Sequence, residues 1–431
     1  MNISASNSSM SEIALEQSSF NSPVVLYTYS FVTASYLRHQ KIVALQDKKI
    51  VDLNCGNGYS TLALALANPS AKILALNCSA TAIEIAQRHL QHYGLQNVEF
   101  QVCPLERFGE ITQKFDYINA ENALDQFSDA AVGFQLLQNK LQPDGIIRVK
   151  VDSAIARFYN YRAKGFFAEL GLLQDTPDKN EIAKVREMMG LLNKGNLLKE
   201  LTWLPKHSTE AGEAAILRDY LFPSIKGFRF SELFNGLESA NLEFISMVRA
   251  KQWDLETLFQ NIEDLPIFLT LRLAEMSLSE QLQLFELLNP IHPTLEFWCG
   301  HPNLEEPAES PSEWTDQEWQ NAQVSFHPQL RTPALYETMQ HCIVQQQVLE
   351  LTQFLPIVPG PLVIDSLMVA CLLPLVSQTL PVSALVEIWQ RIRPLNPLTL
   401  EPTSEGEAWG AIVQLLISLE ELGYVLLERP S

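Results

Sequence analysis

The sequence predicts an α/β protein that begins with a doubly wound parallel sheet covered by helices on both faces. Two observations carry this prediction. Short apolar runs alternate with helical segments between residues 49 and 151, and the first run ends in a glycine-containing turn that opens a helix. Strands that alternate with helices form βαβ units, and such units place parallel strands side by side in one sheet.

Five strands and three connecting helices are expected in this part of the chain. The expected strands cover residues 49–52, 71–76, 98–102, 115–119 and 146–151. The expected helices cover residues 61–67, 81–93 and 132–140. Because open α/β sheets bind ligands at the carboxyl ends of their strands, the residues that follow each strand are the candidate site.

The turn after the first strand, Asp52-Leu-Asn-Cys-Gly-Asn-Gly58, suits an anionic or polar ligand. The helix that follows it presents unpaired backbone N–H groups and the positive end of its dipole. Gly56 and Gly58 allow close backbone approach, and Asn54 is the non-glycine type that best tolerates left-handed dihedrals. A Gly-x-Gly pattern alone is a weak signal, so the order of the neighbouring segments matters more.

In that order, the segments resemble the class I S-adenosylmethionine (SAM)-dependent methyltransferases over roughly residues 20–160. The resemblance rests on Val51-Asp-Leu-Asn-Cys-Gly-Asn-Gly58, Phe115-Asp-Tyr-Ile-Asn119 and Leu141-Gln-Pro-Asp-Gly-Ile-Ile-Arg148. It implies a Rossmann-like sheet with SAM as the cofactor. The implied cofactor-binding residues are Asp52, Asn54, Gly56, Gly58, Asn77, Leu105 and Glu106. The implied catalytic residues are Asn119, Glu121 and Asn122, with Glu121 as a candidate general base.

Three positions depart from the pattern of that family. Asn54 replaces its first glycine, and Asn77 stands where an acidic residue holds the ribose hydroxyls. The acidic residue after the third strand is absent or has moved to Glu106. Hydrogen bonds to charged groups contribute about 1.5–3 kcal/mol and neutral ones about 0.5–1.5. Losing the difference at two positions costs roughly 2–3 kcal/mol, or about two decades of affinity.

Two functions therefore stay open. The first is a working methyltransferase whose favoured acceptor is a protein side chain. The second is a methyltransferase-shaped pseudoenzyme that serves as a protein-binding or assembly factor. An NAD-type oxidoreductase is disfavoured, because the turn lacks a full Gly-x-Gly-x-x-Gly and no acidic residue ends the second strand.

At 431 residues the chain exceeds one ordinary domain. Residues 218–248 resemble the regulatory domain of some bacterial methyltransferases, including rickettsial protein-lysine methyltransferases, and residues 409–428 resemble the end of a winged-helix module. The expected parts are a disordered tail (1–21), the methyltransferase-like domain (22–155), a mostly helical regulatory-like domain (156–300), an acidic Pro-rich linker (301–322) and a small α+β winged-helix-like domain (323–431). The aromatic segment 27–31 is placed either to cover the cofactor or to pack on the edge of the sheet.

Composition narrows the class of protein. A net charge of −20 argues against binding of a nucleic-acid backbone, which needs a basic surface. Six cysteines without paired spacing indicate a reducing compartment, and the interrupted apolar run 367–386 is not a membrane span, so we expect a cytoplasmic protein. His89 and His92 lack acidic or cysteine partners, so no metal site is expected.

Overall fold

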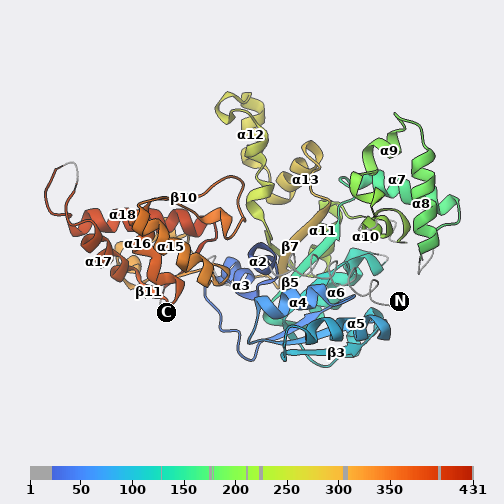
Figure 1. Cartoon of the computed structure of the whole chain (residues 1–431), viewed down its shortest axis with the longest axis horizontal. Coiled ribbons are helices and arrows are strands. Elements are labelled where there is room, and N and C mark those ends of the chain that lie inside the picture. Colours follow the sequence, from blue (N-terminus) through green and yellow to red (C-terminus); the bar gives the residue numbers. More distant parts are fainter. Residues whose placement is uncertain are drawn as a thin grey trace, which may run out of the picture.

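The structure is a computed structural model. It describes residues 22–127, 129–173, 177, 179–209, 212–222, 227–303, 309–396 and 399–429. The tail 1–21, expected to be disordered, lies outside the described residues. Figure 1 shows a central sheet domain with a group of helices on its right and a second, C-terminal group on its left.

A seven-stranded sheet forms the centre of the molecule. Its strands are β1 (Lys49–Asp52), β2 (Lys72–Asn77), β3 (Val98–Val102), β4 (Phe115–Glu121), β5 (Leu141–Asp152), β6 (Glu243–Met247) and β7 (Thr294–Gly300). They lie in the order β3-β2-β1-β4-β5-β7-β6, and β7 runs antiparallel to both of its neighbours. The five expected strands are confirmed. The sheet also takes two strands from the segment 156–300, which the sequence analysis assigned to a separate domain.

Alternating side chains divide the sheet into two faces. On one face, Ile50, Tyr117 and Trp298 pack with α2 (Pro23–Tyr29), α3 (Phe31–His39) and α4 (Tyr59–Ala67). On the other face lies an apolar core with α6 (Ala130–Lys140), α11 (Phe230–Ser239) and α13 (Leu278–Leu288). Helix α5 (Ala80–Gln91) follows β2. Both faces are covered, as a parallel sheet requires.

The segment between β5 and β6 is helical, as expected. Before α11 it contains α7 (Phe158–Glu169), α8 (Lys179–Leu191), α9 (Leu197–Thr202) and α10 (Glu213–Ile216). They enclose a small core of their own that includes Phe167, Val185 and Tyr220. Helix α12 (Ile267–Glu275) projects from the top of the molecule in Figure 1.

The C-terminal part is an α+β unit. Its sheet joins β11 (Leu380–Pro381), β8 (Gln323–Phe326) and β12 (Val425–Glu428), and β9 (Leu349–Glu350) pairs with β10 (Val363–Ile364). Its helices are α14 (Asp316–Asn321), α15 (Pro333–Gln345), α16 (Ser366–Leu372), α17 (Val382–Ile392) and α18 (Glu405–Glu421). Its likeness to a winged-helix module stays a prediction. Within the described part of the expected linker, Trp314 and Trp319 are buried.

Helices α2 and α3 join the C-terminal part to the sheet domain. The ring of Tyr27 lies 4.9 Å from that of His327, and Thr33 Oγ1 is hydrogen-bonded to His327 Nε2 at 2.8 Å. The Tyr36 hydroxyl accepts a hydrogen bond from the backbone N–H of Leu427 at 2.9 Å. The aromatic segment therefore packs between the two parts of the chain, and cover of a cofactor by it stays a prediction.

Candidate functional site

The turn after β1 has the backbone that a close-approaching ligand requires. Asn54 adopts φ 58°, and Gly56 and Gly58 adopt φ 53° and 88°. The expectation that Asn54 tolerates the left-handed conformation is confirmed. A Cβ on Gly58 would lie 2.7 Å from Ala86 Cβ, so the glycine lets α5 pack against the turn. A Cβ on Gly56 would meet no atom within 4 Å, which leaves this backbone open.

Asp52 is buried beneath the turn and fixes its shape. Its Oδ2 accepts hydrogen bonds from Ser60 Oγ at 2.8 Å and Thr61 Oγ1 at 2.6 Å. Its Oδ1 accepts one from Asn119 Nδ2 at 2.7 Å. Burial raises the pKa of Asp52 to about 6, although these three hydrogen bonds oppose the shift. The carboxylate thus connects β1, the start of α4 and β4, which makes it a positioning residue.

The ends of β2 and β3 complete this part of the site. Asn77 Oδ1 accepts a hydrogen bond from the Ser79 N–H at 2.8 Å, and Asn77 Nδ2 lies 3.4 Å from Asn54 Oδ1. Leu105 is buried at the start of a 3₁₀ segment, and Glu106 beside it is exposed. A small depression of about 10 Å³ lies over these strand ends. It is lined by Leu53, Asn54, Leu76, Asn77, Cys78, Cys103, Pro104, Leu105, Phe108 and Gln126.

These residues fit a SAM-like ligand in part. The open Gly56 backbone and the helix N-terminus suit the polar end of such a ligand, whereas the depression beside Leu105 is too small for a nucleoside with the side chains as they stand. Asn77 can hold a ribose hydroxyl without a charge-assisted bond. The structure therefore brings Asn54, Asn77 and Leu105 together, while Glu106 is not among the residues that line the depression.

Arg148 on β5 is the centre of a buried ionic network next to the turn. It is 1% exposed, and its Nη1 donates to Asn119 Oδ1 at 2.7 Å. Its Nη2 forms an ion pair with Glu296 on β7, and its guanidinium lies 3.9 Å from the centre of the Tyr29 ring. Asn119 is therefore enclosed between Asp52 and Arg148.

Glu121 belongs to the same network. Its oxygens accept hydrogen bonds from the Tyr29 hydroxyl at 2.5 Å and from Lys150 Nζ at 2.7 Å. Burial alone would raise the pKa of Glu121, but Lys150 and Arg148 together lower it to about 2. A carboxylate held ionised in this way is a poor proton acceptor, so the structure argues against a role as general base. Asn122 follows as an exposed residue with φ 52°.

A second polar cluster at the same edge of the sheet was missed by the sequence analysis. Asp125 lies in the 3₁₀ segment Leu124–Gln126 directly after β4, and within the described residues its buried Oδ1 has no hydrogen-bond partner. Burial and then Asp152 raise the pKa of Asp125 to about 6, against the opposing effect of Lys164 and Arg157. The available signal was its position: it follows the end of the fourth strand and precedes Gln126, which lines the depression.

The remaining members of this cluster come from β5 and α7. Asp152, the last residue of β5, forms an ion pair with Arg157 Nε at 3.1 Å and accepts a hydrogen bond from the Tyr161 hydroxyl at 3.3 Å. Lys164 is 1% exposed, and burial lowers its pKa to about 8. The cluster therefore forms where the sheet meets the helical segment.

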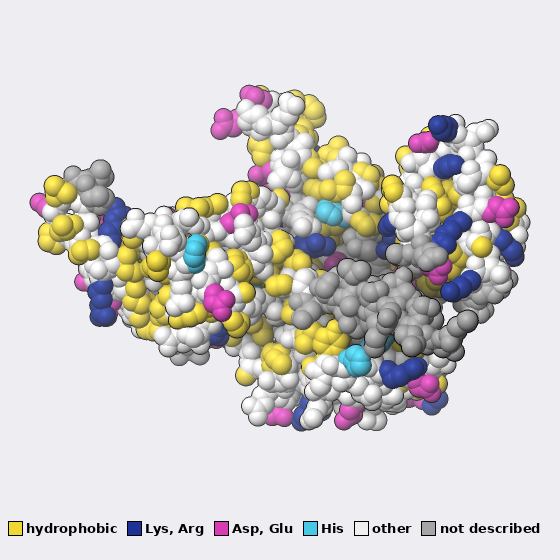
Figure 2. Space-filling model, in the orientation of Figure 1, with side chains coloured by type: hydrophobic (Ala, Val, Ile, Leu, Met, Phe, Trp, Pro, Cys, Tyr) yellow, Lys and Arg dark blue, Asp and Glu magenta, His cyan; other side chains and the backbone are white. Residues whose placement is uncertain are grey.

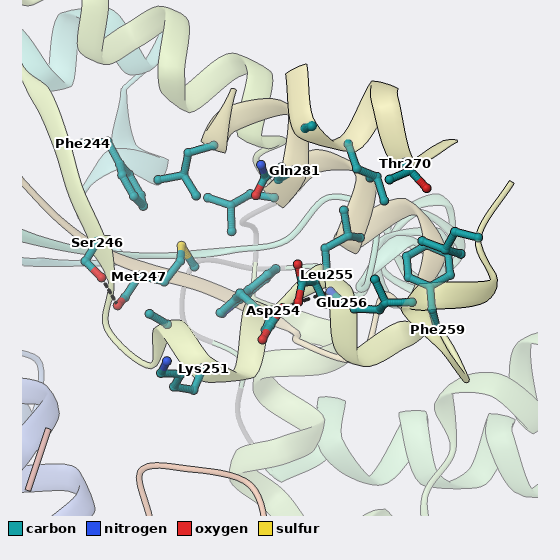
Figure 3. A pocket seen from close by; sticks show the side chains of 18 of the residues that line it. Phe244, Ser246, Met247, Lys251, Asp254, Leu255, Glu256, Phe259, Thr270 and Gln281 are labelled. Carbon is teal, nitrogen blue, oxygen red and sulfur yellow. Dashed lines mark hydrogen bonds between the residues drawn. The ribbon is translucent and has the colours of Figure 1, made fainter. Parts of the chain in front are cut away.

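A separate cavity of about 720 Å³ lies between β6, α12 and α13 (Figure 3). Its walls are largely apolar and include Phe244, Trp253 and Phe259. Beside it, α12 exposes large apolar side chains: Ile267 is 79% exposed and Phe268 is 73% exposed. Figure 2 shows hydrophobic side chains on this projection and on the neighbouring α13.

The described residues offer neither a membrane span nor a metal cluster. None of the described helices has the length and apolar character needed to cross a membrane. No group of three or more His, Cys, Asp or Glu side chains in the described part of the chain could hold a metal ion. All six cysteines are free thiols.

Comparison with known sequences identifies one domain. The methyltransferase domain family matches residues 45–195. An uncharacterised protein of Synechococcus sp. is 28% identical over 294 residues, 67% of this chain and 66% of that protein. The ubiquinone biosynthesis O-methyltransferase of Actinobacillus pleuropneumoniae is 27% identical over 113 residues, 25% of this chain and 47% of that enzyme. The chain thus spans less than two thirds of the length of these relatives.

A solved structure resembles nearly the whole fold. PKMT2 from Rickettsia typhi matches 94% of this chain and 76% of its own length, with a TM-score of 0.60 and 16% identity. The same protein in complex with AdoHcy also gives a TM-score of 0.60, at 15% identity. The likeness of fold therefore extends beyond the central sheet. These comparisons give no support to the alternative of a methyltransferase-shaped pseudoenzyme.

Proposed function

We propose that this chain, whose residues 45–195 belong to the class I SAM-dependent methyltransferases, methylates an amino group of a protein side chain. SAM is the cofactor of this domain, and it supplies a methyl group bound to a sulfonium. The turn from Asp52 to Gly58 would hold the cofactor together with Asn77 and Leu105. The identity of the methyl acceptor is not given by the family. The following observations support a protein side chain as the acceptor.

The exposed apolar surface of α12 carries the proposal of a protein acceptor. Ile267, Phe268 and Leu271 are 79%, 73% and 60% exposed, and they stand beside a cavity of about 720 Å³. Contiguous apolar surface of this kind marks a site of contact with another protein. The fold of PKMT2 matches 94% of the chain. A protein substrate would dock there while its side chain reaches the carboxyl edge of the sheet.

Asp125 is the residue we propose to accept the proton. A side-chain amine must lose a proton before its lone pair can attack the methyl group. A carboxylate with a pKa of about 6 is ionised at neutral pH and is more basic than an ordinary aspartate. Asp125 also follows β4, next to Gln126 at the rim of the depression. Glu121 and Asn119 would then hold the frame around the reacting groups.

The test is methyl transfer from radiolabelled SAM to a mixture of whole-cell proteins, followed by amino-acid analysis of the labelled fraction. We expect label on protein amines. Replacing Ile267 and Phe268 by Ser should lower this transfer about tenfold, because the apolar contact area is lost. The matched control is Val344→Ser on α15, a side chain that is 75% exposed, and it should change nothing.

Both variants should keep wild-type SAM binding, which separates loss of docking from loss of fold. Label confined to small molecules, with an unlabelled protein fraction, would contradict a protein acceptor and leave the methyltransferase itself standing.

A further inference from the structure

A basic pocket lies at the edge of the sheet opposite to the cofactor turn. It has a volume of about 660 Å³ and lies between α3, the chain just before β1 and β4, the start of β5 and the end of β7. It is lined by Phe31, Ser35, Arg38, His39, Lys41, Val43, Lys48, Lys114, Leu141, Pro143, Asp144, His301, Pro302 and Asn303. Because this is the amino edge of the parallel strands, the pocket is distinct from the methyl-transfer site.

The charge of this lining is opposite to that of the chain. Four Lys or Arg side chains, two histidines and one carboxylate, that of Asp144, line the pocket in a protein whose net charge is −20, and the carboxylate of Glu243 also acts on Arg38. Lys48 forms an ion pair with Asp116 at 3.0 Å. The ion pairs within the described residues include none for Arg38, Lys41 or Lys114. A lining in which three of the four cations have no ion pair in the described part of the chain concentrates anions locally.

The guanidinium of Arg38 uses only part of its hydrogen-bonding capacity. Its Nη2 donates to the carbonyl oxygen of His301, whereas its Nε and Nη1 are buried with no hydrogen-bond partner within the described residues. Buried donors without acceptors are costly, and in native proteins they usually find one. Gly300 makes room for this guanidinium, since a Cβ at that position would collide with Arg38 Nη1.

The imidazole of His301 is affected by the positive charges of the same pocket. The pKa of His301 is lowered, first by burial and then by the positive charges of Lys114 and Arg38, against a backbone hydrogen bond to Leu141 that raises it. An anion in the pocket would oppose this electrostatic effect and accept the free donors of Arg38.

We propose that this pocket binds a small soluble anion that carries more than one phosphate group, with Arg38 and Lys114 as its main contacts. A guanidinium matches the geometry of phosphate oxygens, and lysines add point charges around it. Arg38, Lys41 and Lys114 have no ion pair within the described residues, and the volume falls within the usual range of small-molecule sites. The bound anion would also stiffen α3, whose Tyr36 contacts Leu427 in the C-terminal part.

The test is calorimetric titration of the full chain with inorganic pyrophosphate at an ionic strength of about 0.15 M. We expect saturable binding of one pyrophosphate per chain. Arg38→Gln and Lys114→Gln should each weaken it about tenfold, because each removes a charged contact. The control Lys194→Gln replaces an exposed lysine outside the pocket and should bind as the wild type does. No saturable heat from the wild type, or equal binding in all four proteins, would overturn the proposal.

Two further measurements separate loss of this pocket from loss of fold, and a soluble anion from a lipid headgroup. SAM affinity should be unchanged in every variant, which shows that the sheet domain is folded, and Lys114 is exposed, so its replacement leaves the core intact. Vesicles that contain an anionic phospholipid should not retain the protein. Retention that pyrophosphate fails to compete away would point to a lipid headgroup and would contradict a soluble ligand.

Discussion

Two polar groups of residues lie at the carboxyl edge of the same sheet, and they differ in the direction in which the pKa of the carboxylate is shifted. Around Arg148, the carboxylate of Glu121 has close partners on both oxygens, and its pKa is held at about 2. Around Asp125, one carboxylate oxygen has no partner within the described residues, and its pKa is raised to about 6. Lys164 nearby has a pKa lowered to about 8.

From this difference we infer that the Arg148 network stabilises the site and that the Asp125 cluster supplies the group that exchanges a proton. Paired charges stabilise one arrangement of β4, β5, β7 and α2. Groups whose pKa values are shifted towards neutrality are typical of residues that exchange protons with a substrate. The second group forms at the joint between the sheet and the helical segment, so the proposed proton transfer would depend on an element outside the sheet. The next three predictions test this division.

Removing Arg148 should have the largest effect. Arg148→Met leaves Glu296 without its buried cation and Glu121 with Lys150 as its remaining cation, and breaking a buried pair costs about 3–5 kcal/mol. Urea unfolding should show this loss in the free energy of unfolding. Arg107→Met, which breaks an exposed pair with Glu110, should leave the midpoint unchanged. Equal midpoints in both variants would remove the structural role assigned to the network.

Glu121→Gln should destabilise the protein at neutral pH and change its response to acid. The folded pKa of about 2 lies below the ordinary 4.5, so the stabilising contribution is present above pH 4.5 and is lost as the pH falls towards 2. About 1.4 kcal/mol for each pKa unit gives roughly 3 kcal/mol at neutral pH. The free energy of unfolding should therefore depend less on pH between 4.5 and 2 in the variant than in the wild type. A variant as acid-sensitive as the wild type would contradict the assignment.

Asp125→Asn should have the opposite effect on stability and a strong one on activity. The pKa of Asp125 is raised, so its favourable contribution is present below pH 3.8 and is lost as the pH rises through about 6. The amide should therefore stabilise the protein at neutral pH. Methyl transfer should fall about 100-fold, because the proton acceptor is lost.

The pH profile distinguishes this role from a purely structural one. The wild-type rate should rise through about pH 6, and the residual rate of Asp125→Asn should lack that rise. An unchanged profile would exclude Asp125 as the proton acceptor.

Local patterns in the sequence were sufficient for much of the sheet and for the cofactor turn. The alternation of apolar runs with helices predicted five strands, and the tolerance of Asn54 for left-handed dihedrals predicted the turn. Both features depend on neighbouring residues. The ionic network could not be predicted in this way, since Arg148 and Glu296 are brought together only by the pairing of β5 with the distant β7.

Contacts between residues distant in the sequence also explain why Asp125, and not Glu121, is the proposed general base. Glu121 is an ordinary carboxylate in the sequence, and its low pKa arises from Lys150 and Arg148 on the adjacent strand. The environment of Asp125 depends on α7, which packs against the sheet domain only in the folded chain. Residue types and spacing identified the edge of the sheet, but long-range packing decides which carboxylate can accept a proton.

The most direct test of the account is calorimetric titration of the full chain with SAM and with its demethylated product. We predict saturable micromolar binding of both, lost in Gly58→Val, because the new side chain would meet Ala86 at 2.7 Å in a backbone with φ 88°. The matched control is Gly410→Val, where a Cβ meets no atom within 4 Å, and it should bind normally. If the folded wild-type protein gives no heat at millimolar SAM, the account is contradicted. The chain would then be interpreted as a methyltransferase-shaped pseudoenzyme.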